Sequence, residues 1–379
     1  LKGELTPEKL QAEIDRCLVQ VNNQMSTWQS DSELSRFNRF EKDEWFPVSN
    51  ETAQVVQTAR EISEQTGGAF DVTVGPLVNL WSFGPDKSEH KLPSEATIAK
   101  TKSRVGYSLV DVRLSPPALR KSQPDVYVDL SAIAKGFGVD QVAKVLDTHD
   151  FSTYMVEIGG EVRTKGSKPN VESWRVGIET PTPFSRGIQN TLKLSGQSLA
   201  TSGDYRNFVV IEGKTYSHTI DPRTGWPVDH GVASASVLAE SCMLADAYAT
   251  SLMVLGPEEG YNWAKEHNIA ALLIIRDGDT FIEKPTPAFE KLFPTKAEPT
   301  MTTTWLIAAG VFLLAVALMS VGVIFSNRRI TGSCGGLAGL KDDSGRTLCD
   351  ACTNPAPECR GPEETADQED EPQETSPHH

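Results

Sequence analysis

From Trp305 to Phe325, this 379-residue chain has 21 consecutive residues without a charged side chain. This run separates a long N-terminal part from a short C-terminal part. When helical, an apolar stretch of this length matches the thickness of the hydrocarbon core of a bilayer. The pattern therefore predicts a single transmembrane helix within residues 304–326. A globular fold must then be built from the residues before this helix, and a separate short segment follows it.

Composition divides the rest of the chain into four parts. Residues 1–285 have the mixed composition of a globular body, and residues 286–303 form a linker rich in Pro, Lys and Glu. Residues 327–360 carry four cysteines, and residues 361–379 hold seven acidic side chains and no Lys or Arg, which is typical of a disordered tail. The net charge is −15 without a clustered basic face, so the sequence argues against a nucleic-acid partner.

Basic side chains are unequally distributed about the predicted span. Those before it are Lys291 and Lys296, and those after it are Arg328, Arg329, Lys341 and Arg346. Positive charge favours the cytoplasmic side of a membrane. We therefore expect the cysteine-containing tail in the cytoplasm and the body on the opposite side, which is the periplasm if the membrane is a bacterial inner membrane.

The cysteines after the span form one cluster in the sequence. Four thiols lie within 26 residues, at Cys334, Cys349, Cys352 and Cys359. Thiolates in a reducing compartment suit iron or zinc, and the spacing matches no standard zinc module. A set of incidental thiols in a flexible tail is the alternative.

Hydrophobic periodicity predicts an α+β body, with mainly antiparallel sheets flanked by helices. Helices are predicted at residues 7–23 after a Thr6 cap, 51–65, 94–103, 243–255 and 258–266, with one more after Asp129. Strands are predicted at residues 126–130, 153–158, 174–179, 191–194 and 233–238, with hairpins turning at Glu212–Gly213 and Asp277–Gly278. Two polar segments, Met25–Asn38 and Gly68–Trp81, are predicted to be loops.

The segment from His218 to Pro227 concentrates reactive groups in ten residues. His218, Asp221 and Arg223 stand beside Pro, Gly and Trp residues that fix a turn. Loops braced in this way often hold catalytic groups. The alternative is an ordinary Asx-Pro turn with a surface histidine and arginine.

Two further segments suggest a phosphate and a metal. Asp129 ends a predicted strand, and Lys135 lies one helical turn inside the helix that follows, so free amides and the positive end of the helix dipole favour an anion. Asp246 and Thr250 lie one turn apart on a predicted helix and offer two hard oxygens of the kind that Mg²⁺ prefers. A capped helix start and a buried Asp–Thr hydrogen bond are the respective alternatives. Together with His218 or Asp221 as a proton acceptor, these groups suit phosphoryl transfer.

At this point the sequence resembles the ApbE family of FAD:protein FMN transferases over roughly residues 1–285. The resemblance rests on several ordered motifs: Met25-Ser-Thr-Trp28, Ser32-Glu-Leu-Ser-Arg-Phe-Asn38, Gly68-Ala-Phe-Asp71, Gly75–Trp81, Asp129–Gly136, Glu157-Ile-Gly-Gly-Glu161, Ala200–Arg206, His218–Gly225 and the helix with Asp246.

The resemblance implies an Mg²⁺-dependent enzyme that moves the FMN half of FAD onto a Thr or Ser hydroxyl of a partner protein and releases AMP. By carry-over, the FAD site is lined by Met25, Ala69, Phe70, Asp71, Trp81, Asp129, Lys135 and Ile220. Mg²⁺ is held by the carbonyl of Ala132 together with Asp246 and Thr250. Some relatives have an acid where this chain has Ala249, so one metal ion rather than two is expected here.

On this resemblance, the catalytic residues are His218, Asp221 and Asp246. We hypothesise that His218 accepts the proton of the target hydroxyl and that Asp221 or Arg223 orients the loop. Two alternatives remain: a protein that binds FAD without transferring it, and an Mg²⁺-dependent FAD pyrophosphatase that forms FMN and AMP.

The C-terminal part, from Met301 to about Cys359, resembles NqrM, a maturation factor of the sodium-pumping NADH:quinone oxidoreductase (Na⁺-NQR). The resemblance rests on one apolar span followed by Gly332-Ser-Cys-Gly-Gly336 and a Cys-x2-Cys pair. It implies iron delivery to a cysteine-ligated centre of that complex. The same complex carries FMN bound covalently to Thr, so its subunits are the expected flavin acceptors.

Overall fold

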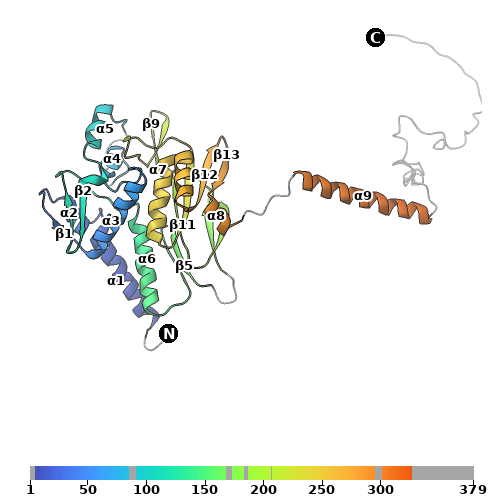
Figure 1. The fold of residues 1–379 in the computed structure, drawn as a ribbon, viewed down its shortest axis with the longest axis horizontal. Helices are drawn as coiled ribbons and strands as arrows, with labels where there is room; N and C mark the ends of the chain where they lie inside the picture. The colour runs from blue at the N-terminus through green and yellow to red at the C-terminus, as the bar shows by residue number, and fades with distance from the viewer. Residues whose placement is uncertain are drawn as a thin grey trace, which may run out of the picture. The chain divides into compact units, whose positions relative to one another are not determined.

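The fold was analysed in a computed structural model, which describes residues 5–84, 91–167, 173–182, 187–205, 207–294 and 301–326. The chain divides into two compact units, Leu1–Thr295 and Lys296–His379. The first unit is the α+β body, and Figure 1 shows its helices gathered around one large sheet.

A six-stranded antiparallel sheet forms the centre of the body. Its strands follow the order β13 (Thr280–Pro285), β12 (Ala270–Asp277), β11 (Val232–Ala239), β8 (Ser198–Gly203), β5 (Glu161–Lys165) and β4 (Tyr154–Ile158). Every pairing in it is antiparallel. The prediction of an α+β body with antiparallel sheets is confirmed.

Both faces of this sheet are buried. On one face, Ala271 and Leu273 pack against the long helix α7 (Cys242–Glu266), and α6 (Ala134–Thr148) lies beside α7 (Figure 1). On the other face, Leu272 and Ile274 pack with the β6–β7 hairpin (Trp174–Glu179 and Ile188–Leu194) and with α8 (Pro287–Leu292). Burial on both faces explains why β12 reads as a continuous apolar run.

A second layer is built by the N-terminal half of the chain. Its helices are α1 (Pro7–Met25), α2 (Glu33–Asn38), α3 (Asn50–Gln65), α4 (Gly75–Leu80) and α5 (Glu95–Lys102). A small sheet of β1 (Phe46–Pro47), β3 (Pro117–Lys121) and β2 (Val110–Leu114) lies beside them, joined through the 3₁₀ turn η1 (Tyr107–Leu109). The apolar faces of α1, α2, α3 and the small sheet share one core with the start of α6. Helices α4 and α5 pack in a separate cluster through Leu77 and Ile98.

Most predicted elements with local start or stop signals are confirmed. Thr6 caps α1 and Ser94 caps α5. The hairpin of β9 (Phe208–Ile211) and β10 (Lys214–Ser217) turns at Glu212 and Gly213, both with positive φ. The two predicted C-terminal helices are the halves of α7, which break at Gly256, where φ is 83°.

Three predictions about the N-terminal layer are wrong. The two segments predicted as loops contain α2 and α4: Ser32 caps α2, and Pro76 lies in the first turn of α4. Residues 126–130 are not a strand. The side-chain amide of Asn38 donates to the Val128 carbonyl at 2.8 Å and accepts from the Val128 N–H at 2.8 Å, so a side chain takes the place of a neighbouring strand.

The predicted linker also starts too early. Helix α8 lies within it, is capped by Thr286 and buries Phe289 against the central sheet. The body therefore extends beyond residue 285. A proline in the first turn is compatible with the start of a helix. Composition alone did not distinguish this short helix from a linker.

The apolar run of the second unit forms the helix α9 (Met301–Ser326), so its helical conformation is confirmed. Among the described residues, however, no helix combines the length and apolar character needed to cross a membrane. The predicted transmembrane helix at residues 304–326 thus gains no support from the structure. Residues 327–379, with the cysteine segment and the acidic tail, lie outside the described residues.

Candidate functional site

Helices α6 and α7 meet at their N-terminal turns, and this junction joins two of the predicted motifs. Asp246 on α7 is 2% exposed, and its Oδ2 accepts a hydrogen bond of 3.0 Å from the N–H of Gly136 in the first turn of α6. Ile133, the cap residue of α6, makes no side-chain capping bond. The carboxylate of Asp246 therefore caps α6 from the neighbouring helix and lies at the positive end of its dipole.

Gly136 allows this close approach because it lacks a β-carbon. A β-carbon at this position would lie 2.8 Å from the amide nitrogen of Met243 and would overlap the carbonyl of Cys242. The contacts are to backbone, which cannot rotate away. Only glycine therefore fits where α6 crosses α7.

Gly136→Ala is expected to separate the two helices and lower the stability of the protein by about 3 kcal/mol. The matched control is Gly138→Ala, because a β-carbon there lies 3.8 Å from Ile158, an ordinary contact. In a helix interior this control should be neutral or stabilising by up to about 1 kcal/mol. Thermal unfolding of both variants measures the difference, and equal melting temperatures would contradict the close-approach argument.

Asp140 fixes the same junction from its other side. Its carboxylate accepts from the N–H groups of Cys242 and Met243 at 3.0 and 2.9 Å, so it caps α7, and it also pairs with Arg163 on β5. Each of the two helices is thus capped by an aspartate from the other. This reciprocal arrangement sets the distance between the α6 N-terminus and the Asp246 side chain.

Lys135 points toward a buried carboxylate. Its Nζ lies 2.5 Å from Oε1 of Glu161, which begins β5 and is 2% exposed. Burial acts to lower the pKa of Lys135, but Asp246 and Glu161 outweigh it and raise the pKa, so the side chain stays charged. The predicted anion site therefore has two of its donors, Lys135 Nζ and the Gly136 N–H, directed at protein carboxylates.

The donors proposed for Mg²⁺ fit a single hard cation. Asp246 and Thr250 lie one turn apart on α7, and Thr250 Oγ1 is 3.2 Å from Ser202 Oγ. Burial raises the pKa of Asp246 to about 7, and the positive charge of Lys135 offsets this only in part. Among the described residues, no hydrogen bond ends on the Ala132 carbonyl oxygen, so it has a lone pair to offer. A carboxylate, a hydroxyl and a carbonyl match the preferences of Mg²⁺.

The part of the chain that the structure describes contains no additional metal site built from clustered side chains. No group of three or more His, Cys, Asp or Glu side chains there has the geometry to hold a metal ion. The iron ligands predicted at Cys334, Cys349, Cys352 and Cys359 lie outside the described residues. Ala249 is fully buried and supplies no oxygen for a second metal ion.

His218 is held in one orientation at the base of the β9–β10 hairpin. Its Nδ1 is 3.0 Å from the carbonyl oxygen of Asn207, so the neutral ring donates there and leaves the Nε2 lone pair for a ligand. Phe83 lies edge-on to the ring. Burial lowers the pKa of His218, and Lys135 lowers it further, while Asp204 raises it. The net effect is a neutral imidazole near pH 7, as a general base requires.

Asp221 and Arg223 brace the loop that follows. The carboxylate of Asp221 accepts from the backbone N–H of Arg223 at 2.8 Å and from its guanidinium at 3.0 to 3.3 Å. Arg223 also pairs with Glu259 on the second half of α7 at 2.9 Å. With these partners, Asp221 is placed to orient the loop rather than to accept a proton.

Most of the predicted flavin-site residues have little exposed surface. Their exposure is 7% or less at Met25, Ala69, Phe70, Asp71, Trp81 and Ile220. Asp71 accepts from the N–H groups of Thr73 and Tyr107, both at 2.7 Å, and burial raises its pKa. The apolar members of this set are divided among three core clusters, so any contact that they make with a ligand involves little of their surface.

Trp81 supports the reactive loop from within the core. Its indole N–H donates to the carbonyl of Gly225 at 3.0 Å, and its ring packs against Tyr216 and Trp226. Ile220 pairs with Pro227 in the same cluster. Trp81 therefore determines where the loop after His218 lies.

Asp129 is half-buried where the extended segment turns into α6. Its N–H donates to the Val72 carbonyl at 2.7 Å, and its carboxylate accepts from the N–H of Ser131 at 2.9 Å. This turn places Ala132 and Lys135 directly after it. The motifs around Asp129 and Asp246 thus come together at the start of α6, and the charge of Lys135 also lowers the pKa of His218.

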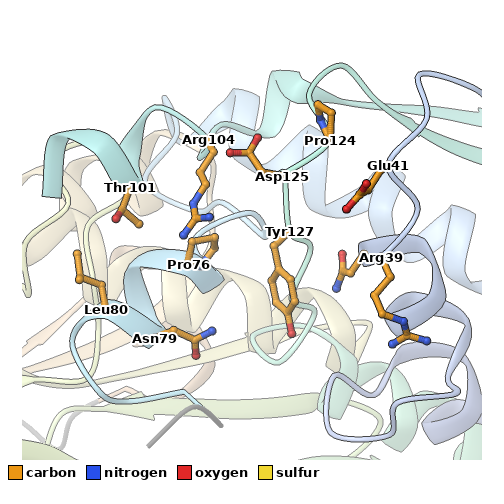
Figure 2. A pocket seen from close by; sticks show the side chains of 11 residues that line it. Arg39, Glu41, Pro76, Asn79, Leu80, Thr101, Arg104, Pro124, Asp125 and Tyr127 are labelled. Carbon is orange, nitrogen blue, oxygen red and sulfur yellow. The ribbon is translucent and has the colours of Figure 1, made fainter. Parts of the chain in front are cut away.

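A cavity of about 810 Å³ lies beside this site rather than in it. Figure 2 shows Arg104, Asn79 and Tyr127 among the side chains around it. None of the predicted site residues lines this cavity. Tyr127 connects the two places, because it lies two residues before Asp129 and packs closely on Gly75.

Sequence reasoning missed the roles of Asp140, Glu161 and Asn207. Glu161 ends a quoted motif, but nothing in its spacing indicated that it would meet Lys135. Asp140 follows Gly136 by four residues and reads as an ordinary helix surface position. Asn207 contributes through its carbonyl, which any residue type supplies.

Comparison with known proteins gives matches in two parts of the chain. The ApbE family model matches residues 2–273, and the (Na⁺)-NQR maturation NqrM model matches residues 323–372. The body resembles the flavin transferase ApbE from Vibrio cholerae with a TM-score of 0.71 and 43% identity, over 77% of this chain and 93% of that one. It resembles the apo form of the Pseudomonas stutzeri flavinyl transferase ApbE with a TM-score of 0.72 and 36% identity, over 78% and 91%.

Curated relatives agree with this likeness. The Vibrio cholerae FAD:protein FMN transferase is 45% identical over 288 residues, which is 76% of this chain and 86% of the relative. The Haemophilus influenzae FAD:protein FMN transferase is 44% identical over 295 residues, or 77% and 85%. This chain therefore belongs to the ApbE family and is a transferase enzyme.

Proposed function

We propose that the body transfers the FMN half of FAD to a Thr or Ser hydroxyl of an acceptor protein and releases AMP. The observation that carries this proposal is the junction of α6 and α7, where Asp246, Lys135 and the α6 N-terminus share one site. A pyrophosphate needs its negative charge neutralised at the position where it is cleaved. Lys135 and the α6 N-terminus offer positive charge there, and a cation held by Asp246 would supply the rest; the relatives that share the fold are named for this reaction.

The reaction requires one proton acceptor and one leaving group. The acceptor hydroxyl oxygen forms a bond to the FMN phosphorus, the bond between that phosphorus and the bridging oxygen breaks, and AMP leaves with the electron pair. Nε2 of His218 takes the hydroxyl proton, and the Asn207 carbonyl holds the ring in the required tautomer. Asp221 and Trp81 keep the following loop in place.

Asp246, Thr250 and the Ala132 carbonyl would hold Mg²⁺, which supplies electrostatic stabilisation to the phosphate oxygens when bound. Lys135 contributes a fixed positive charge at the edge of the same site. Met25, Ala69, Phe70, Asp71, Asp129 and Ile220 contribute to the walls of the FAD site in this proposal.

Two other activities would use the same residues: FAD hydrolysis to FMN and AMP, and FAD binding without chemistry. The test is to incubate the full chain with FAD, Mg²⁺ and a Thr-bearing acceptor domain, and to measure AMP together with flavin fluorescence on the denatured acceptor. Transfer gives both products in equal amounts, and an acceptor with Thr→Val at the target position gives neither. AMP without labelled acceptor would indicate a pyrophosphatase, and neither product would indicate a binding protein.

The second unit leads us to propose that the chain is anchored in a bacterial inner membrane through Trp305–Phe325, with the body in the periplasm. The support is the uncharged run itself and the match of residues 323–372 to NqrM. The flavin acceptors are then subunits of Na⁺-NQR or related redox complexes, and the four tail cysteines bind iron for their maturation. Membrane fractionation and iron analysis of the full chain test this proposal, and a chain found free of membrane and iron would contradict it.

A further inference from the structure

Glu161 is a buried charge at the site that the proposed reaction does not use. It is 2% exposed, and Oε1 receives Lys135, while Oε2 is buried without a hydrogen-bond partner among the described residues. A buried carboxylate with an unsatisfied oxygen is costly. Such groups call for an explanation other than stability.

The turn before Glu161 fixes the position of this carboxylate. Glu161 follows Gly159 and Gly160, whose φ values of 65° and 104° form the tight turn between β4 and β5. A β-carbon at Gly159 would lie 3.5 Å from Oε2 of Glu161 and 3.9 Å from the side chain of Lys135. The glycine thus leaves room beside both groups.

The two partners differ in how firmly they are held. Glu161 is fixed by its burial in the first position of β5, whereas the side chain of Lys135 is 49% exposed. A half-exposed lysine has a flexible four-carbon stem and many rotamers in the absence of a partner. The fixed carboxylate therefore determines where the mobile ammonium group lies.

We infer that Glu161 is a positioning residue that holds the Lys135 ammonium group at the N-terminus of α6, in place to bind the pyrophosphate of FAD. This inference rests on the proposed function. It assigns Glu161 an effect on ligand binding that acts through Lys135 and not through contact with the ligand. Removing Glu161 then frees Lys135 to extend into solvent.

The test is a double-mutant cycle on FAD binding, measured by flavin fluorescence of the full chain in the presence of Mg²⁺. Glu161→Gln and Lys135→Gln are each expected to weaken FAD binding about tenfold, and the double variant should be no weaker than Lys135→Gln alone. The matched control is Glu157→Gln. Glu157 is an exposed carboxylate of the same turn that accepts from the Gly160 N–H, so FAD binding should not change.

Each outcome of this cycle decides the inference. Unchanged or tighter binding by Glu161→Gln, a loss that adds to that of Lys135→Gln, or an equal loss in Glu157→Gln would each overturn it. Melting temperatures show whether weaker FAD binding results from a folding defect. Such a defect is not expected, because burial raises the pKa of Glu161 and Gln removes a desolvated charge. Transfer by the wild-type chain is measured in parallel. If the wild type fails to bind FAD, the proposed function fails, whereas binding that Glu161→Gln leaves intact rejects only the inference.

Discussion

His218→Ala is expected to slow FMN transfer by about 100- to 10,000-fold, the usual contribution of a general base, while FAD binding is retained. The imidazole is the group placed to accept the hydroxyl proton, because its Nδ1 is directed at the Asn207 carbonyl and Nε2 is free. The fold should tolerate the change. The backbone N–H of residue 218 donates to the same carbonyl at 3.2 Å, so the hairpin base stays closed without the ring.

The pH dependence gives a second measure of the same role. Burial lowers the pKa of His218 below its ordinary value of 6.5, so the neutral base predominates at pH 7 and is lost as the pH falls through that lowered pKa. The wild-type transfer rate should therefore rise with pH through this lowered pKa and level off above it. The His218→Ala variant should lose this rise of the transfer rate with pH.

His149→Ala is the matched control, because His149 pairs with Glu13 between α1 and the end of α6. It should transfer FMN at nearly the wild-type rate. A His218→Ala variant that keeps the wild-type rate, or that fails to bind FAD, would show that the imidazole is not the base.

Sequence patterns predicted the parts of this molecule that depend on neighbouring residues. Thr6 and Ser94 cap the helices they precede, and Glu212–Gly213 forms the expected turn, because caps and tight turns are short-range interactions. The same holds for Asp246 and Thr250, whose spacing alone places them one above the other on a helix.

The errors are of two kinds. Helices α2 and α8 were missed although Ser32 and Thr286 cap them locally, whereas the other errors arise from long-range contacts. Asn38 replaces a strand partner for Val128 across 90 residues of sequence, and Asp140 caps α7 across about 100. Glu161 meets Lys135 only because the β4–β5 turn lies against the start of α6. No local pattern encodes such pairings, so the site could be predicted as separate motifs but not as an electrostatic unit.

Asp246→Asn is expected to abolish Mg²⁺ binding and reduce transfer to background, yet to raise the melting temperature of the metal-free protein. Burial raises the pKa of Asp246 to about 7, whereas an unfolded aspartate titrates near 3.9. Above pH 7 the folded protein carries this charge at a cost on the order of 4 kcal/mol. Asparagine keeps an oxygen for the Gly136 N–H and removes the charge.

The pH dependence of this stability follows from the direction of the shift. Between about pH 4 and 7 the folded state holds a proton that the unfolded state has lost, so the metal-free wild type becomes less stable as the pH rises through this range. The difference in melting temperature between Asp246→Asn and the wild type should grow across the same range and stay constant above pH 7.

Mg²⁺ should reverse the order of the two proteins. A divalent cation compensates the Asp246 charge, so Mg²⁺ should raise the melting temperature of the wild type more at pH 8 than at pH 6 and leave Asp246→Asn unchanged. Asp15→Asn, on the exposed face of α1, serves as the matched control and should respond to Mg²⁺ as the wild type does. If Mg²⁺ stabilises Asp246→Asn as strongly as the wild type, Asp246 is not a ligand. The variant could instead be less stable than the metal-free wild type at pH 8. The hydrogen bond from Gly136 to the charged carboxylate would then outweigh the cost of burying the charge. In that case the carboxylate that we assign to the metal also stabilises the junction of α6 and α7.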